Sequence, residues 1–216
     1  MVLLHHKNRE ETAMKFYDNT HAPNARRVRM FMAEKGMTIP TVAIDLAGKE
    51  HFGDAFTAIN PRQRIPVLET DDGQVIGESI AICRYLEAIQ PEPNLFGRTA
   101  AEIGEIEMRN RQLEFEFYMR IAAVFRHSHP GMADREVPQV QAWAEANRPK
   151  VDAELAALDR HLKGKDFFAA GRFTVADITA LIAVDFMRVI KLRIPETMVD
   201  LTRWRNAMLA RPSASA

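Results

Sequence analysis

Two short segments of the sequence carry residue types that suit the binding of a small peptide. The first, residues 60–68, reads NPRQRIPVL and places Pro66 at the start of a strand-like run. An X-Pro bond adopts the cis form at a cost of only ~0.5–1 kcal/mol, so this proline could turn a backbone amide outward to pair with an extended peptide. Taken alone, a proline here is also an ordinary strand start.

The second segment, residues 77–82, reads GESIAI and begins a helix at Glu78 and Ser79. Unpaired N–H groups and the positive end of the helix dipole favour a bound carboxylate at such a point, and the serine hydroxyl adds a donor. Glu78 supplies the complementary acceptor for an ammonium group. Taken alone, the same two residues would also serve as a plain helix cap.

The elements that must position these segments alternate between strand and helix up to about residue 90. The ranges 16–17, 41–44, 65–68 and 75–76 are strand-like, and a turn at 71–73 joins the last two into a hairpin. One helix is predicted from Pro23 to Gly36, one or two helical turns within 51–59, and another helix over 80–89. The predicted order is therefore β-α-β-α-β-β-α.

The rest of the chain is predicted to be all helical. Residues 91–93 read PEP and break the first pattern, while apolar residues recur every three or four positions within 106–124, 151–162 and 198–208. Residues 174–190 are apolar nearly all round, which predicts a helix at the centre of this part. Thr174 and Asp177 fit a capping box, and we assign them to structure rather than to catalysis.

Three motifs in the same order make the chain resemble the glutathione S-transferases, as a cytosolic, bacterial-type member. These are the N-P-x-x-x-V/I-P-x-L pattern at 60–68, the E-S-x-A-I pattern at 78–82 and the F-T-x-A-D pattern at 173–177. The resemblance implies an α/β thioredoxin-like N-terminal domain followed by an all-α C-terminal helical domain. We accordingly expect a loose extension over 1–13, a glutathione-binding domain over 14–90, a linker over 91–98 and the helical domain over 99–216.

The resemblance also implies which residues hold glutathione. The Ile65–Pro66 bond is predicted to be cis, with the backbone of Ile65 paired in strand fashion to the cysteinyl part of glutathione. Glu78 and Ser79 would bind the ammonium and carboxylate of the γ-glutamyl group. No metal is implied, and glutathione is expected as a co-substrate.

The glycine end of glutathione would lie near two basic side chains. Arg64 stands where the family has Lys or Gln, and could meet the glycine carboxylate through a charge-assisted hydrogen bond. His51 could help at the same end. The alternative for a lone histidine is a solvent-exposed position on the surface.

The group that activates the thiol is expected between the first strand and the first helix, because the thiolate is the species that attacks. Here the sequence departs from the family, since Ala22 stands where a hydroxyl residue is usual. Asn24, Thr20 or the helix N-terminus could polarise the sulfur instead, in that order of preference. Both side chains are also ordinary turn and cap residues.

Three side chains are candidates for the pocket of the second substrate. Phe115, Tyr118 and Met119 lie off the apolar stripe of the helix predicted within 106–124. A hydrophobic electrophile could bind against them, beside the thiol. The alternative is that they pack at a dimer contact or between helices.

The charge balance argues against other classes of partner. The 216 residues include 29 basic and 29 acidic side chains, so no net field draws the protein to nucleic acid or to an anionic membrane surface. Arg26, Arg27 and Arg29 form a short basic patch that we interpret as a solvated helix face. His127 and His129 have too little context for a metal site.

The single cysteine and the lack of a long apolar run suggest a protein of a reducing, cytoplasmic compartment. Cys83 cannot form an internal disulfide, and no stretch approaches the ~18 apolar residues of a membrane span. A thiol-disulfide oxidoreductase is a further alternative, against which Cys83 counts because it lies in a predicted helix and has no partner cysteine.

The leading hypothesis is a glutathione transferase in which the bound thiolate attacks a small hydrophobic electrophile, with detoxification as the expected role. Family resemblance further implies a homodimer. The open alternatives are a noncatalytic interaction protein with this fold, which the residue Ala22 suggests, and a glutathione-dependent isomerase or peroxidase.

Overall fold

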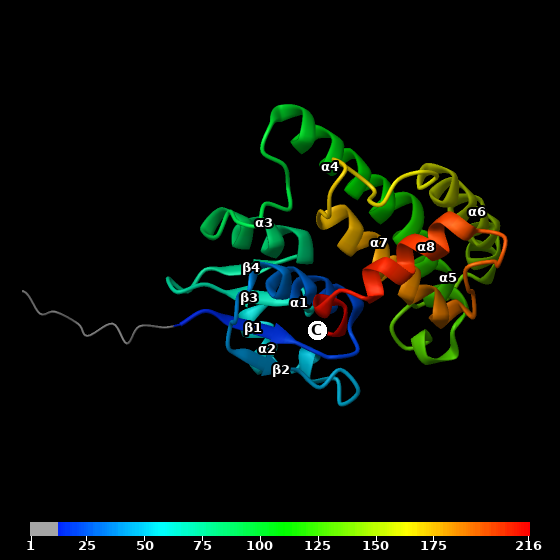
Figure 1. Ribbon diagram of the computed structural model, residues 1–216. Coiled ribbons are helices and arrows are strands. Elements are labelled where there is room, and N and C mark those ends of the chain that lie inside the picture. Colours follow the sequence, from blue (N-terminus) through cyan, green and yellow to red (C-terminus); the bar gives the residue numbers. More distant parts are fainter. Residues whose placement is uncertain (1–12) are drawn as a thin grey trace, which may run out of the picture.

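The computed structural model describes residues 13–216, and Figure 1 shows a sheet-containing part in blue and cyan beside a helical part in green to red. The expected loose extension therefore lies, except for Ala13, outside the described residues. The first part runs β1 (Lys15–Asp18), α1 (Pro23–Lys35), β2 (Thr41–Ala43), the 3-10 turn η1 (Glu50–Phe52), α2 (Asp54–Ile59), β3 (Val67–Glu69), β4 (Val75–Gly77) and α3 (Ser79–Ile89). This confirms the predicted β-α-β-α-β-β-α order.

The four strands form one mixed sheet with the order β2-β1-β3-β4. Strand β1 pairs in parallel with β2 and antiparallel with β3, and β3 pairs antiparallel with β4. Phe16 and Leu68 lie opposite each other and are fully buried. This small mixed sheet with its helices is the expected α/β thioredoxin-like arrangement.

The second part is helical, as expected. It runs α4 (Ala100–Gln112), the π-helical segment η2 (Leu113–Tyr118), α5 (Met119–Ser128), the 3-10 turn η3 (Pro130–Met132), α6 (Gln141–His161), α7 (Val175–Phe186), the 3-10 turn η4 (Met187–Ile190), α8 (Val199–Leu209) and the 3-10 turn η5 (Pro212–Ser215). The residues of α7 from Val175 to Val184 are all buried, which confirms its central position.

The helix predicted within 106–124 differs in one respect, because a π-helical segment separates α4 from α5. Leu113, Phe117 and Ile121 remain fully buried across this segment. Their spacing of four is therefore kept by both kinds of helix, and the apolar pattern alone does not reveal the π turn.

The capping box at the start of α7 is confirmed. One carboxylate oxygen of Asp177 accepts hydrogen bonds from Thr174 N at 3.0 Å and Thr174 Oγ1 at 3.2 Å, and the other accepts from Phe168 N and Trp204 Nε1. Burial raises the pKa of Asp177 to about 6, against the effect of these donors. Asp177 thus joins α7 to α8 and to the preceding loop.

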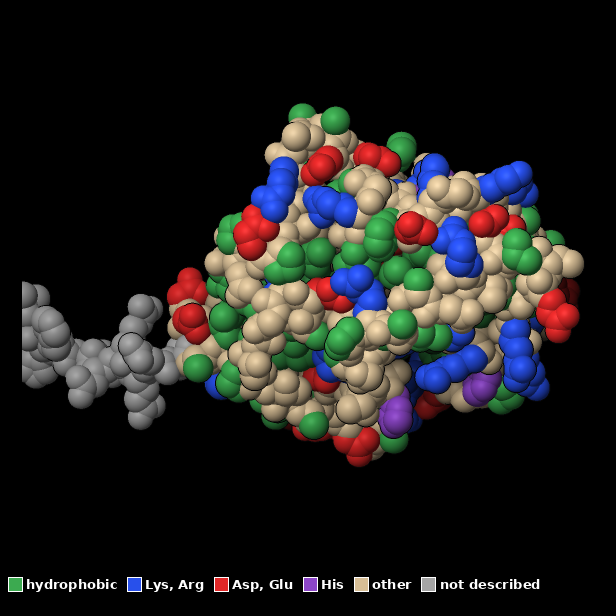
Figure 2. All heavy atoms as spheres, viewed as in Figure 1, with side chains coloured by type: hydrophobic (Ala, Val, Ile, Leu, Met, Phe, Trp, Pro, Cys, Tyr) green, Lys and Arg blue, Asp and Glu red, His purple; other side chains and the backbone are tan. Residues whose placement is uncertain are grey.

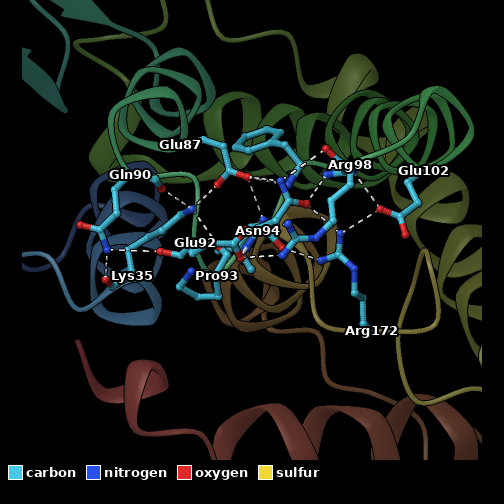
Figure 3. A network of polar contacts seen from close by, with 12 residues as sticks. Lys35, Glu87, Gln90, Glu92, Pro93, Asn94, Arg98, Glu102 and Arg172 are labelled. Carbon is cyan, nitrogen blue, oxygen red and sulfur yellow. Dashed lines mark hydrogen bonds and ion pairs between the residues drawn. The ribbon is translucent and has the colours of Figure 1, made fainter.

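A buried lysine ties the sheet-containing part to the segment that leaves it (Figure 3). The Lys35 side chain is fully buried at the end of α1, where it pairs with Glu87 and donates to the carbonyl oxygens of Gln90 at 2.8 Å and Pro93 at 2.7 Å. Glu87 also accepts from the backbone N–H of Leu95 at 3.0 Å. The course of residues 90–95 is therefore set by one cation and one carboxylate.

The last residues of the chain lie against α1, far from them in sequence (Figure 1). Arg211 forms a two-point ion pair with Glu34, and Ser213 donates to the same carboxylate. Arg26 of α1 donates to the carbonyl oxygen of Ala214 at 2.9 Å. The C-terminal turn η5 therefore closes one side of the contact between the two parts.

The face of the molecule in Figure 2 shows acidic and basic side chains interspersed over most of its area. This distribution agrees with a net charge of zero. None of the helices in the described range 13–216 has the length and apolar character needed to cross a membrane.

We expect Lys35→Met to lower the free energy of unfolding by ~3 kcal/mol or more, because it leaves the Glu87 carboxylate buried without its cation. The matched control is Lys49→Met, since Lys49 pairs with Asp134 where both side chains are more than half exposed, and we expect no measurable change there. Urea titrations of the two variants make the comparison. Equal stability of both variants would show that the buried pair does not hold the junction.

Candidate functional site

The register of the sheet brings three connecting segments to one end of the molecule. Tyr17 of β1 and Gly77 of β4 both lie opposite Val67 of β3. The connection that follows β1, residues 65–66 just before β3, and residues 78–79 just after β4 must therefore lie side by side. These are the segments that the sequence singled out.

The prolyl segment has the predicted geometry. The Ile65–Pro66 peptide bond is cis, which confirms the expectation. Asn60 anchors the loop, since its side chain donates to Arg64 O at 2.7 Å and accepts from Arg62 N at 3.1 Å. Within residues 13–216, no hydrogen bond occupies the backbone N–H or C=O of Ile65. Both groups remain available to an extended peptide.

Ser79 sits at the first position of α3 and receives a hydrogen bond from an unexpected residue. Arg27 Nη1 lies 2.8 Å from Ser79 Oγ and 3.3 Å from a carboxylate oxygen of Glu114. The Arg27 guanidinium also stands over the Tyr118 ring, 5.5 Å from its centroid. Because Arg27 supplies the donor, the hydroxyl proton of Ser79 is left free for another acceptor.

The interpretation of Arg26, Arg27 and Arg29 as a solvated face is wrong. Arg27 is only 1% exposed, and its Nε and Nη2 atoms are buried with no partner in the described chain. Arg26 and Arg29 are partly buried in ion pairs with Asp185 and Asp18. Arg27 precedes the buried Phe31 by one helical turn, and this spacing was the signal in the sequence that it faces inward.

Glu78 links β4 to α3 in a backbone conformation that is unusual for a residue with a side chain. Its φ is 64° and its ψ is 116°, while its side chain is exposed and has no partner within the described residues. Such a conformation costs about 1–3 kcal/mol for an L-residue other than glycine and is common at binding sites. It places the Glu78 carboxylate beside the open end of α3.

The two basic candidates lie near each other, in different settings. His51 of η1 is 5% exposed, which rules out the solvent-exposed alternative, and its Nδ1 is buried without a partner in the part of the chain that the structure describes. Burial lowers the pKa of His51, and the charges of Arg135 and Arg64 lower it further. The Arg64 side chain is exposed.

The start of α1 carries the candidates for thiol activation. Ala22 is its N-cap and gives no side-chain hydrogen bond, and the first turn of this helix holds no acidic residue. Asn24 points its Oδ1 into a buried position that lacks a partner among residues 13–216, whereas Thr20 is exposed. The N–H groups at this end of α1 are thus left open to an anion.

A cavity of about 620 Å³ opens beside this helix start, between the β1–α1 connection, the C-terminal end of α7 and the middle of α8. Thr20 lines it, but the three side chains expected at the acceptor pocket do not. Phe115 and Met119 are 57% and 43% exposed, and Tyr118 is buried with its ring 5.4 Å from that of Phe186. Tyr118 therefore packs between helices, and the acceptor role of the three stays a prediction.

The remaining candidates for chemistry are buried or ungrouped. Cys83 lies inside α3, and burial raises the pKa of its thiol to about 12, so the group stays protonated and inaccessible. No group of three or more potential metal ligands occurs within residues 13–216.

Replacing Glu78 by glycine should stabilise the fold relative to replacing it by alanine. Both changes remove the carboxylate, but only glycine tolerates φ 64°, and glycine is also the better N-cap, so we expect Glu78→Gly to exceed Glu78→Ala by ~1 kcal/mol in free energy of unfolding. Chemical denaturation of the pair gives this difference. An alanine variant as stable as the glycine variant would show that the strain is absent.

Comparison with known proteins places the chain among relatives along most of its length. The family model described as Glutathione S-transferase, N-terminal domain, matches residues 21–89, and the one described as Glutathione S-transferase, C-terminal domain, matches residues 114–212. Glutathione S-transferase 2 of Saccharomyces cerevisiae is 35% identical over 203 residues, which cover 93% of this chain and 87% of the relative.

Structural comparison agrees. A glutathione S-transferase domain-containing protein of Marinobacter aquaeolei superposes with a TM-score of 0.87 at 37% identity, over 92% of this chain and 98% of the other. A shorter match, 37% identical over 84 residues, joins 38% of this chain to 40% of a maleylacetoacetate isomerase of Pseudomonas aeruginosa. The full-length matches, together with the site geometry above, show that this chain belongs to the glutathione S-transferase family.

Proposed function

We propose that the protein binds glutathione at the shared end of β1, β3 and β4 and joins the glutathione sulfur to a carbon atom of a small hydrophobic electrophile, forming a glutathione conjugate. The observation that carries this proposal is the meeting, at one end of the sheet, of three elements whose hydrogen-bonding groups suit glutathione. These are the backbone of Ile65, the start of α3 at Ser79, and the uncapped start of α1. Family membership supports the same activity.

Residues next to the cis proline and at the start of α3 would hold the cysteinyl and γ-glutamyl parts of glutathione. The free N–H and C=O of Ile65, next to Pro66, pair with the cysteinyl backbone as one strand pairs with another. Ser79 donates its hydroxyl proton to the γ-glutamyl carboxylate, because Arg27 already fills its acceptor side. Glu78 accepts from the ammonium group. The buried charge of Arg27 adds attraction for the carboxylate.

The glycine carboxylate would lie toward Arg64 and His51. Arg64 is exposed and has no ion-pair partner within the described residues, so it can turn to a ligand. The Nδ1 of His51 is buried and unpartnered, and a carboxylate is the acceptor that its protonated form would satisfy.

The thiol would be activated at the start of α1. An N-terminal helix end lowers the pKa of a nearby thiol, because it favours the anion. Thr20 and the amide NH₂ of Asn24 can donate hydrogen bonds in this region, while Asn24 Oδ1 is turned into the protein. The thiol proton leaves to solvent, and the sulfur lone pair forms the new bond to carbon. In a displacement the leaving group then departs with its bonding electrons, and in an addition the electrophile is then protonated.

The oligomeric state of the protein, its cellular compartment and its biological role are part of the same proposal. We infer a cytoplasmic homodimer that removes reactive electrophiles. Exposed apolar side chains on α4 and the adjoining segment, Ile103, Met108 and Phe115, support a further protein contact along this part of the chain. Family membership supports the same assembly.

A second candidate is a protein that binds glutathione without turnover. The observation in its favour is Ala22, which offers no hydroxyl at the start of α1. An isomerase is favoured by the partial match to a maleylacetoacetate isomerase, which covers 38% of this chain. Both candidates keep the same glutathione site and differ in what the sulfur does.

Calorimetric titration with glutathione, combined with conjugation of 1-chloro-2,4-dinitrobenzene, tests the proposal. We expect Ser79→Ala to weaken glutathione binding about tenfold or more, the loss of one charge-assisted hydrogen bond, and Ser215→Ala at the exposed C-terminal turn to leave it unchanged. Thr20→Val or Asn24→Ala should raise the pKa of the bound thiol and lower kcat with binding retained.

The possible failures separate the candidates. Tight binding without conjugation would support the noncatalytic alternative. No binding by the wild-type protein would overturn the assignment of this end of the sheet. Conjugation that survives both Thr20→Val and Asn24→Ala would assign thiol activation to the backbone of α1.

Glutathione should raise the pKa of His51, because a carboxylate nearby favours the protonated ring, whereas burial and two arginines lower it in the free protein. Binding then takes up a proton at His51 as the pH falls below its bound-state pKa. NMR titration of the ring proton, assigned through His51→Gln, measures the shift. His161, whose pKa burial also lowers, lies in the helical part and serves as the control that should not respond. An unchanged His51 would place the glycine end elsewhere.

A further inference from the structure

The 620 Å³ cavity beside the start of α1 has the size of a site for one small molecule. One wall is the β1–α1 connection with Thr20, Ala22 and Pro23, and another is formed by the end of α7 and by residues of the stretch 187–194 that follows it. The last helix α8 closes a third side. Both parts of the protein therefore contribute to a single hollow.

The charged side chains that line the cavity are strongly unbalanced. Arg26, Arg188, Arg193 and Arg205 face a single carboxylate, that of Asp185, which leaves an excess of three positive charges. Asp185 is already occupied, since Arg26 and Arg205 each reach one of its oxygens at 2.7 Å.

Two of these arginines have no carboxylate partner within residues 13–216. Arg188 lies in η4 and Arg193 three residues beyond it, and both are exposed at the cavity. Guanidinium groups bind carboxylates through two parallel hydrogen bonds, which gives direction as well as attraction. An anionic group entering the cavity would meet both without displacing an existing ion pair.

The same wall is apolar between its charges. Met187, Val189, Leu192 and Ile194 alternate with the two free arginines along the chain and line the cavity with Phe186. A ligand that fits both features has an apolar, ring-sized body and one acidic substituent. A plain hydrocarbon would leave the guanidinium groups unused, and a small inorganic anion would leave the apolar wall unused.

The geometry points to a carboxylate-bearing apolar electrophile as the second substrate, recognised by Arg188 and Arg193. This inference rests on the proposed function, which puts the glutathione sulfur at the start of α1, and Ala22 and Pro23 at that start line the cavity. The acid would be held at 188–193, with the reactive carbon directed toward the sulfur.

A matched pair of aromatic substrates tests the inference, namely 4-chloro-3-nitrobenzoate and the neutral 4-chloro-3-nitrobenzamide. In either reaction the thiolate sulfur bonds to the ring carbon that carries chlorine, chloride leaves with the bonding electron pair, and the thiol proton goes to solvent. Each substrate is compared with itself across variants, so that its intrinsic reactivity cancels.

In the double variant Arg188→Gln/Arg193→Gln we expect kcat/KM for the benzoate to fall about tenfold or more, and kcat/KM for the benzamide to stay within about twofold. The control is Arg160→Gln/Lys163→Gln, which removes two positive charges from exposed positions at and just after the end of α6, away from the residues that line the cavity. The control should leave both substrates unchanged. Equal losses for benzoate and benzamide, or the same loss in the control, would overturn the inference.

A binding measurement distinguishes failure of the acid-binding inference from failure of the proposed transferase function. The unreactive 4-methyl-3-nitrobenzoate is titrated into the protein saturated with glutathione, and its affinity should fall about tenfold or more in the double variant. Arginine-dependent binding without conjugation of either substrate would overturn the transferase proposal and leave the acid-binding cavity standing. Conjugation of the benzamide, with binding of the acid that does not depend on the two arginines, would support the transferase proposal and overturn the acid-binding cavity.

Discussion

The pairing of β3 with its two neighbours is the constraint on which the site depends. Phe16 and Leu68 lie opposite each other and are buried in the larger core, while Tyr17 and Val67, one position along, are buried in a second cluster on the other face. A slip of one residue would exchange these two sets. The Tyr17 hydroxyl also donates a hydrogen bond to the Glu69 carboxylate of the neighbouring strand β3 at 2.7 Å. Burial raises the pKa of Tyr17 to about 12. Because the register is fixed, the segments before β3 and after β4 must lie side by side at the same end of the sheet.

Helix α1 connects the two sides of the proposed site through adjacent residues. Arg27 is turned inward, toward Ser79 and the π-helical segment, whereas Arg26 is turned toward Asp185 and the C-terminal turn. The inward arginine is a charge buried with few partners, a costly arrangement that proteins keep where it orients other groups. It explains how the hydroxyl of Ser79 can be fixed in direction while its proton stays available. The outward arginine is balanced by a carboxylate and so has a structural part to play.

Much of this architecture could be predicted from the sequence, because the strands, turns and caps are encoded locally. The order of elements, the capping box of Thr174 and Asp177, and the cis bond before Pro66 are confirmed. What failed depended on contacts between distant segments. Arg27 looks like part of a basic patch until its partners, 52 and 87 residues away, are known. The cavity escaped notice for the same reason, since it is formed by residues 20–26 together with residues from 182 onward.

The two unpaired arginines both belong to one short connection between α7 and α8. Residues 187–194 supply these charges and most of the apolar wall, and they belong to a different stretch of chain from Ile65 and Ser79 at the sheet end. In the proposed function, glutathione and the second substrate would thus be recognised by separate stretches of chain. If this assignment holds, grafting a different connection of equal length would change which second substrates react while leaving the glutathione site unchanged, so this loop is the segment to replace when redesigning the specificity of the protein.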